Sequence, residues 1–296
     1  MNEPAPVDST AQGRRIVATT ADDATSPAPA TPPTEPLETS TADGPSPRRL
    51  KWEIAIVLGL SLGQSAAFAI TRFVEYYVKS VDLSTTTSTL NRSTSSVAWI
   101  DLVQQVMVIG FRLMPVLLVF YLFSERGRSA WRTLGLVGPW SRWKGDIGWT
   151  FGIAAIIGLP GIALYLGSRA LGMTVNINTS GLPDEWWAAT VLLLSAASVG
   201  ILEETIAVGY FVTRLRQLRW GVPAAILASA LLRGAYHLYQ GWPMALGNVV
   251  MGVVFAWVYV KRGRLGPLIA AHLLMDAVAF IGPTVAPDAW LEWLGL

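Results

Sequence analysis

The chain has 296 residues, of which 52% are hydrophobic and 14% are charged, and its formal net charge is +2. This composition is too apolar for a water-soluble protein of this length and predicts a protein that crosses the membrane several times. The small net charge and the absence of a basic tract give no indication of a nucleic-acid partner. There is no cysteine, which excludes disulfide bonds, thiol catalysis and thiolate metal ligands.

The N-terminal segment, residues 1–47, differs from the rest of the chain. It is dominated by Ala, Pro, Thr, Ser and Asp and almost lacks large apolar side chains. Such a segment cannot bury a core, so we predict a disordered tail. It also lacks the apolar stretch of a cleaved signal peptide, and the first membrane span is expected to direct insertion. Residues 48–296 are expected to form one transmembrane domain.

The remaining sequence contains long apolar segments separated by short polar ones. Each segment is long enough to cross a hydrocarbon core of about 30 Å as a helix. We therefore predict an all-α, polytopic transmembrane helix bundle of about seven spans. The predicted spans are residues 52–71, 97–123, 147–168, 186–213, 222–240, 243–260 and 265–283.

The basic residues of the connecting loops predict the orientation. The N-terminal flank and every second loop after it carry 14 Lys and Arg residues, whereas the alternate loops carry 4. Cytoplasmic loops are enriched in basic residues, so the tail is expected in the cytoplasm and the C-terminus outside a multi-pass plasma-membrane protein. The segments at 72–96 and 176–185 are then external loops. The four basic residues on the external side are Arg72, Lys79, Arg92 and Arg169.

Adjacent carboxylates, Glu203 and Glu204, lie in the fourth predicted span with apolar residues on both sides. Two neighbouring carboxylates in an apolar helix repel one another, an arrangement that suits a general base or a pair that shares one proton. The alternative is that the pair lies in a loop mistaken for a buried segment. Ionisable residues inside spans are costly and usually functional, which favours the first interpretation.

The two histidines of the chain each have an ionisable residue four positions away in an apolar span. Arg233 precedes His237 in the fifth span, and His272 precedes Asp276 in the seventh. A spacing of four places both side chains on one helix face. Arg233 can then offset buried negative charge, and Asp276 can orient the His272 imidazole. The alternatives are that Arg233 extends to the membrane surface and that the second pair is a hydrogen bond of helix packing.

Taken in order, these groups resemble the motifs of the CPBP family of intramembrane proteases, named for CAAX-prenyl and bacteriocin processing and also called the Abi family. That family is marked by E-E-x-x-x-R, then F-x-x-x-H, then H-x-x-x-N or H-x-x-x-D. Glu203 and Glu204 match the first motif, His237 the second, and His272 with Asp276 the third.

The resemblance covers residues 186–280 and implies an intramembrane endopeptidase that hydrolyses a membrane-associated or lipidated peptide. It implies that Glu203 is the general base, that His237 holds the same water, and that Glu204 supports the site electrostatically. His272 and Asp276 would face the substrate carbonyl, with Asp276 as the residue that orients the imidazole. The expected partners are membrane lipids and a peptide or protein substrate, without nucleic acid.

Two positions depart from the family pattern. Val208 replaces the Arg of the first motif, and Arg233 replaces the Phe of the second. We interpret these as one exchange, in which a cation lost from the fourth span returns on the fifth. Arg233 should then pair with Glu203 and Glu204. If the exchange does not compensate, the chain is a catalytically inactive membrane scaffold of the same family.

Two further questions stay open in the sequence. Two histidines and a carboxylate are a common catalytic zinc set, so Glu204, His237 and His272 are the expected ligands if a metal is used, and no metal is needed otherwise. A proton-coupled transporter also uses buried Glu, His and Asp.

The predicted spans place His237 and Glu203 at different depths in the membrane, which conflicts with a water molecule shared by the two side chains. His237 lies about fifteen residues from the cytoplasmic end of its span and Glu203 about eleven, or roughly 22 and 16 Å.

Overall fold

A computed structural model describes the chain apart from residues 1–44, 125–127, 140–141, 179–180, 183 and 286–296. Almost all of the predicted tail therefore lies outside the described residues, as does the C-terminal end. Gly44–Leu296 forms a single compact unit. Its first helix begins at Pro47, and the Ser46 side chain caps it by accepting from the Arg49 backbone amide.

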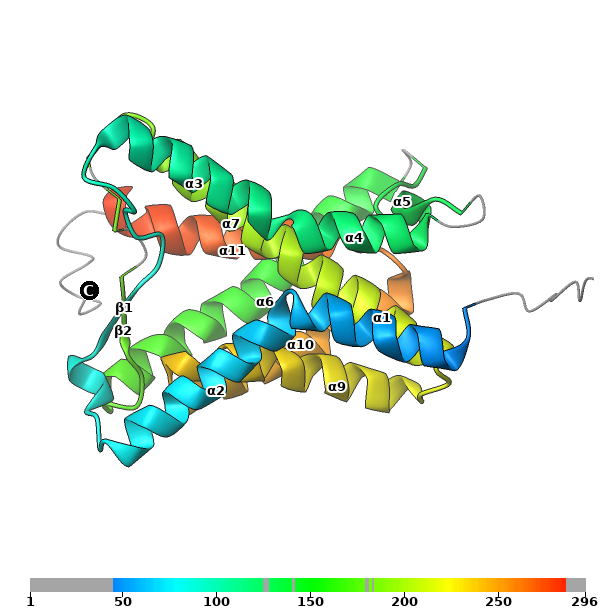
Figure 1. Cartoon of the computed structure of the whole chain (residues 1–296), viewed down its shortest axis with the longest axis horizontal. Coiled ribbons are helices and arrows are strands. Elements are labelled where there is room, and N and C mark those ends of the chain that lie inside the picture. The colour runs from blue at the N-terminus through cyan, green and yellow to red at the C-terminus, as the bar shows by residue number, and fades with distance from the viewer. Residues whose placement is uncertain (1–44, 125–127, 140–141, 179–180, 183, 286–296) are drawn as a thin grey trace, which may run out of the picture. The chain divides into compact units, whose positions relative to one another are not determined.

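The described residues are helical almost throughout, and the helices of this unit lie alongside one another in Figure 1. In chain order the elements are α1 (Pro47–Gly59), α2 (Leu62–Val78), η1 (Leu83–Thr85), β1 (Thr87–Thr89), α3 (Ala98–Arg112), α4 (Met114–Phe123), α5 (Ala130–Thr133), α6 (Trp143–Ala170), β2 (Asn176–Asn178), α7 (Ala188–Glu203), η4 (Glu204–Val212), α8 (Thr213–Gln217), α9 (Val222–Tyr236), η5 (Leu238–Gln240), α10 (Trp242–Arg262) and α11 (Gly266–Val285). η1 and η5 are 3₁₀ turns, and η4 is a π-helix.

The predicted all-α transmembrane bundle is confirmed, whereas the number of spans stays a prediction. Among the described helices, four are long and apolar enough to cross a membrane: Ala98–Phe123, Trp143–Ala170, Ala188–Gln217 and Trp242–Arg262. The pair α1 and α2, bent by 56°, would be a fifth. α9 and α11 are apolar but shorter. The 15 residues of α9 extend about 22 Å, less than a typical hydrocarbon core.

Glycines allow the helices that carry the site to approach closely. A Cβ at Gly252 of α10 would lie 2.7 Å from the Ala230 Cα of α9, and one at Gly234 of α9 would lie 2.9 Å from the Ala245 backbone oxygen of α10. Gly200 of α7 faces His272 of α11, where an added Cβ would lie 3.5 Å from the His272 side chain, in ordinary van der Waals contact. A side chain at Gly252 or Gly234 would push the backbones of α9 and α10 apart. The close contacts of α9 with α10 and of α7 with α11 fix the positions of the polar residues between them.

Two short strands join the loops that the sequence predicts to be external. β1 and β2 pair in parallel, with Thr87 opposite Asn176 and Thr89 opposite Asn178. They lie at one end of the helices, to the left in Figure 1. Sequence reasoning missed this pairing because a strand of three residues is too short to show strand periodicity.

Candidate active site

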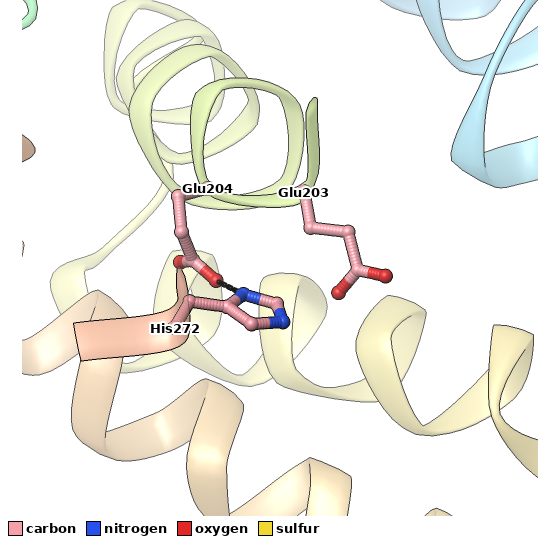
Figure 2. Close-up of side chains that lie close together, drawn as sticks. All are labelled: Glu203, Glu204 and His272. Atoms are coloured by element: carbon pink, nitrogen blue, oxygen red, sulfur yellow. Dashed lines mark hydrogen bonds and ion pairs between the residues drawn. The ribbon is translucent and has the colours of Figure 1, made fainter. Parts of the chain in front are cut away.

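The two adjacent glutamates lie where the fourth predicted span changes its helical geometry. Glu203 is the last residue of α7, and Glu204 is the first of η4. From this point the backbone follows π geometry, a rare form that is frequent at functional sites. Ser229 of α9 donates to the Ala207 carbonyl oxygen inside η4 at 2.7 Å. Figure 2 shows the two carboxylates diverging from the helix, with Glu204 directed at His272.

Glu204 is the better buried of the two carboxylates and contacts α9 and α11. His272 Nδ1 lies 2.7 Å from Glu204 Oε1, and Arg233 Nη2 donates to the same oxygen at 2.5 Å. A carboxylate oxygen accepts, so Nδ1 of His272 carries the proton. The imidazole therefore turns its Nε2 away from Glu204.

Among the described residues, the hydrogen bonds and ion pairs of the Glu203 carboxylate are with α9 and the turn that follows it. The Tyr236 hydroxyl donates to Glu203 Oε2 at 2.8 Å, and Arg233 Nη1 donates to the same atom at 3.4 Å. His237, which ends α9, has its Nε2 3.8 Å from this oxygen. That separation is short enough for one water molecule to contact both the imidazole and the carboxylate.

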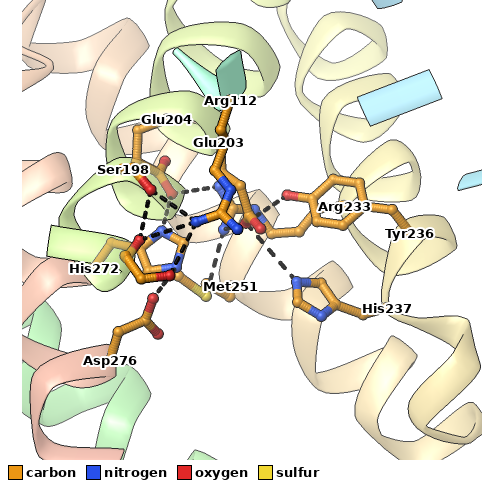
Figure 3. A network of polar contacts seen from close by, with 11 residues as sticks. Arg112, Ser198, Glu203, Glu204, Arg233, Tyr236, His237, Met251, His272 and Asp276 are labelled. Atoms are coloured by element: carbon orange, nitrogen blue, oxygen red, sulfur yellow. Dashed lines mark hydrogen bonds and ion pairs between the residues drawn. The ribbon is translucent and has the colours of Figure 1, made fainter. Parts of the chain in front are cut away.

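Arg233 bridges both carboxylates with one guanidinium, as Figure 3 shows. Its side chain is fully buried, and the guanidinium lies 5.4 Å from the centre of the Phe255 ring and 3.7 Å from the Met251 sulfur. A buried cation needs such partners to be stable at this depth. Arg233 is therefore held between the two acidic residues and does not extend to the membrane surface. Val208, where the family motif has Arg, is buried in the apolar core.

Asp276 lies one helical turn beyond His272 on α11. Its Oδ2 is 3.6 Å from His272 Nε2, longer than the contact between Nδ1 and Glu204. The sequence assigned orientation of the imidazole to Asp276, whereas in the structure Glu204 makes the shorter hydrogen bond. Glu204 thus orients the ring, and Asp276 adds negative charge beside the opposite nitrogen.

Arg112 is a second cation of the network, and sequence reasoning gave it no role. It ends α3, and its Nη1 donates to Ser198 Oγ at 2.8 Å and to Ser195 Oγ at 3.0 Å on α7. Figure 3 shows its side chain among the polar groups around Glu203. The signal was present, because Arg112 was one of two basic residues inside the predicted spans.

Glu203 and His237 no longer differ in depth, because the helix that carries Glu203 ends later than predicted. α8 continues the fourth span to Gln217, so Glu203 lies 14 residues from the end of that helix and not about eleven. His237 lies 15 residues beyond the first residue of α9. The two side chains are therefore at similar depths on neighbouring antiparallel helices.

A metal was one of the two possibilities left open by the sequence. Among the described residues, the group whose ligand atoms lie within 4.8 Å of one another is Glu203, Glu204 and His272, so the set differs from the predicted one by Glu203 in place of His237. This set does not fit a divalent cation, because the Arg233 guanidinium contacts both carboxylates and would repel it. Glu204 Oε1 also already accepts from two donors.

The part of the chain that carries this network also matches a known family. Residues 185–278 match the family described as Rce1-like, type II CAAX prenyl endopeptidase. The match confirms the CPBP resemblance. It spans α7 through most of α11 and includes every residue of the network except Arg112. No curated protein and no solved structure matches the chain.

Residues 185–278 are thus similar to a protease family, which implies a peptide or protein substrate, and the apolar helices indicate an integral membrane protein. The match begins within one residue of the predicted start of the resemblance at 186. The two departures at Val208 and Arg233 fall inside it.

Proposed function

We propose that this chain is an intramembrane endopeptidase that hydrolyses a peptide bond of a membrane-associated or lipidated peptide with a water molecule activated by Glu203 and His237. The observation that carries the proposal is the separation of 3.8 Å between His237 Nε2 and Glu203 Oε2 in a buried polar centre. A shared water within hydrogen-bonding distance of both groups is polarised by the imidazole and deprotonated by the carboxylate.

The proposed reaction uses the two sides of the site in turn. Glu203 takes a proton from the water, and the water oxygen forms a bond to the substrate carbonyl carbon. His272, held at Nδ1 by Glu204, donates from Nε2 to the developing oxyanion. The carbon–nitrogen bond then breaks, and Glu203 returns its proton to the leaving amine. Donation from Nε2 requires a protonated imidazole, and the two ring nitrogens of His272 lie 2.7 Å from Glu204 and 3.6 Å from Asp276.

The arrangement of charges supports hydrolysis over proton transport. The buried ionisable groups of three helices converge on one centre and do not form a path across the unit. The Val208 departure would favour an inactive scaffold if it left the carboxylates without a cation. Arg233 supplies that cation, since its guanidinium contacts both carboxylates. Location in the plasma membrane with a cytoplasmic N-terminus is part of the proposal.

The test is the variant Glu203→Gln, which preserves the shape of the side chain and removes the base. We expect loss of hydrolysis with normal expression and insertion, because an amide cannot accept the proton. Peptides of membranes from cells carrying the parent, Glu203→Gln or the exposed-loop control Asp184→Asn are compared by mass spectrometry. A substrate should accumulate with Glu203→Gln alone. Equal peptide content in all three strains would instead identify a scaffold, and hydrolysis by Glu203→Gln would place the base elsewhere.

A further inference from the structure

A cavity of about 300 Å³ adjoins the proposed active site. Its wall combines residues of α2, β1 and the end of α9, including Ser65, Tyr76, Tyr236 and Tyr239. Tyr236 connects the cavity with the site, since its hydroxyl donates to Glu203 at 2.8 Å. A group bound in this cavity therefore lies one side chain away from the proposed base.

The cavity is positively charged. Arg72 and Arg92 are among the residues that line it, and the lining contains no acidic residue. Arg72 shares Glu75 with Lys79, which lies closer to that carboxylate, at 2.6 Å compared with 3.3 Å. Within the described part of the chain, the Arg92 guanidinium makes no hydrogen bond or ion pair. One arginine is partly neutralised and the other keeps its full charge.

This concentration of charge is local. The predicted external side has four basic residues, and two of them line this one cavity. Of the other two, Lys79 pairs with Glu75, and Arg169 donates to the Ser84 backbone oxygen at 3.2 Å. Basic residues are disfavoured on that side of a membrane protein, so two arginines in one cavity call for a ligand.

We infer that the cavity binds a carboxylate of the substrate peptide, with Arg92 as its main partner and Arg72 as the second. Guanidinium groups bind carboxylates through paired, charge-assisted hydrogen bonds, and tyrosine rings provide surfaces for the adjacent peptide. The inference rests on the proposed function and adds a specificity site to it. The carboxylate could be the C-terminus of the peptide or an acidic side chain near the cleaved bond.

Binding can be measured without knowledge of the natural substrate. The purified full chain in detergent is titrated with N-dodecanoyl-Gly-Gly as the free carboxylate and as the amide, by calorimetry. We expect the parent to bind the carboxylate about tenfold more tightly, the scale of one or two hydrogen bonds between charged groups. Arg92→Gln should reduce this preference to within about twofold, whereas Arg92→Lys should keep part of it. Arg169→Gln is the matched control and should keep all of it.

Two results would overturn the inference. One is equal binding of carboxylate and amide by the parent, and the other is an equal loss of preference in Arg169→Gln, which would indicate general surface charge. A substrate that accumulates with Glu203→Gln is then synthesised with an amidated C-terminus and, separately, with amidated acidic side chains. The form with the higher KM identifies the recognised carboxylate. Cleavage of all forms with one KM refutes the carboxylate site and leaves the proposed hydrolysis standing.

Discussion

Charge balance at the level of single residues is the main difference between this site and its family motif. Arg233 occupies the position of an aromatic residue, and its guanidinium contacts Glu203 and Glu204 together. A single cation between two carboxylates lowers their mutual repulsion in an apolar surrounding. The residue that departs from the motif thus contacts both carboxylates of the first motif.

The exchange between Arg233 and Val208 makes a reciprocal prediction. Arg233→Phe should destabilise the protein by about 3 to 5 kcal/mol and impair hydrolysis, because it leaves two buried carboxylates without their cation. Adding Val208→Arg should restore much of both. Hydrolysis rate and thermal unfolding in detergent are measured for the parent, both single variants and the double variant. Additive effects in this cycle would show that the two positions do not exchange one function.

The motif residues could be selected from the sequence because ionisable groups inside apolar spans are rare and therefore conspicuous. Tyr236 was missed because a tyrosine at a span end has many uses, and only the end of α9 at this residue directs its hydroxyl to Glu203. Arg112 was visible but lies on a helix without any motif. Its partners are two serines, which give no pattern in an apolar sequence.

Helix packing determines how well these residues are placed. Gly252 of α10 faces both Ala230 and the Arg233 side chain of α9, so a methyl group there must separate the two helices. Gly252→Ala should therefore lower stability by about 1 to 3 kcal/mol and reduce hydrolysis. Gly152→Ala on α6 is the control, since no atom lies within 4 Å of its added methyl group. It should be neutral or stabilising by up to about 1 kcal/mol, from helix propensity. Thermal unfolding and hydrolysis of both variants are compared, and similar losses would refute the packing argument.

The π geometry of η4 could not be predicted from the sequence. The apolar composition of residues 204–212 is compatible with an ordinary α-helix, and the change depends on contacts made by other helices. The seven predicted segments all contain helices, because apolar length is a strong signal. Their ends were less certain, and α9 ends at Tyr236 before the predicted boundary at 240.

For the whole molecule, the orientation predicted by the basic loops can be tested directly. The chain has no cysteine, so a single introduced thiol reports its own side of the membrane. Thr85→Cys and Arg132→Cys place thiols at exposed positions in loops predicted to lie outside and inside. An impermeant maleimide should label intact cells carrying Thr85→Cys, whereas Arg132→Cys should react only after permeabilisation. The reverse pattern would invert the proposed topology.

The N-terminal segment makes the second prediction at this scale. A truncated chain that begins at Pro45 should insert and hydrolyse substrate as the parent does, because it retains α1 and its cap at Ser46. A chain that begins at Arg48 lacks the cap and should be less stable by about 1 kcal/mol. Membrane fractionation, unfolding temperature and hydrolysis are compared for the two. If the chain that begins at Pro45 inserts but does not hydrolyse substrate, the tail takes part in substrate recruitment.

The two carboxylates face different helices, although they belong to consecutive residues. Glu203 contacts Tyr236 at the end of α9, and Glu204 contacts His272 of α11. Their Cα atoms are separated by one trans peptide unit, a distance that covalent geometry fixes at about 3.8 Å. Rearrangements of α9 or α11 during substrate entry can break a hydrogen bond on either side but cannot change this separation. The two halves of the centre, to which we assign water activation and oxyanion binding, are therefore joined covalently, and helix motions around them leave that connection unchanged.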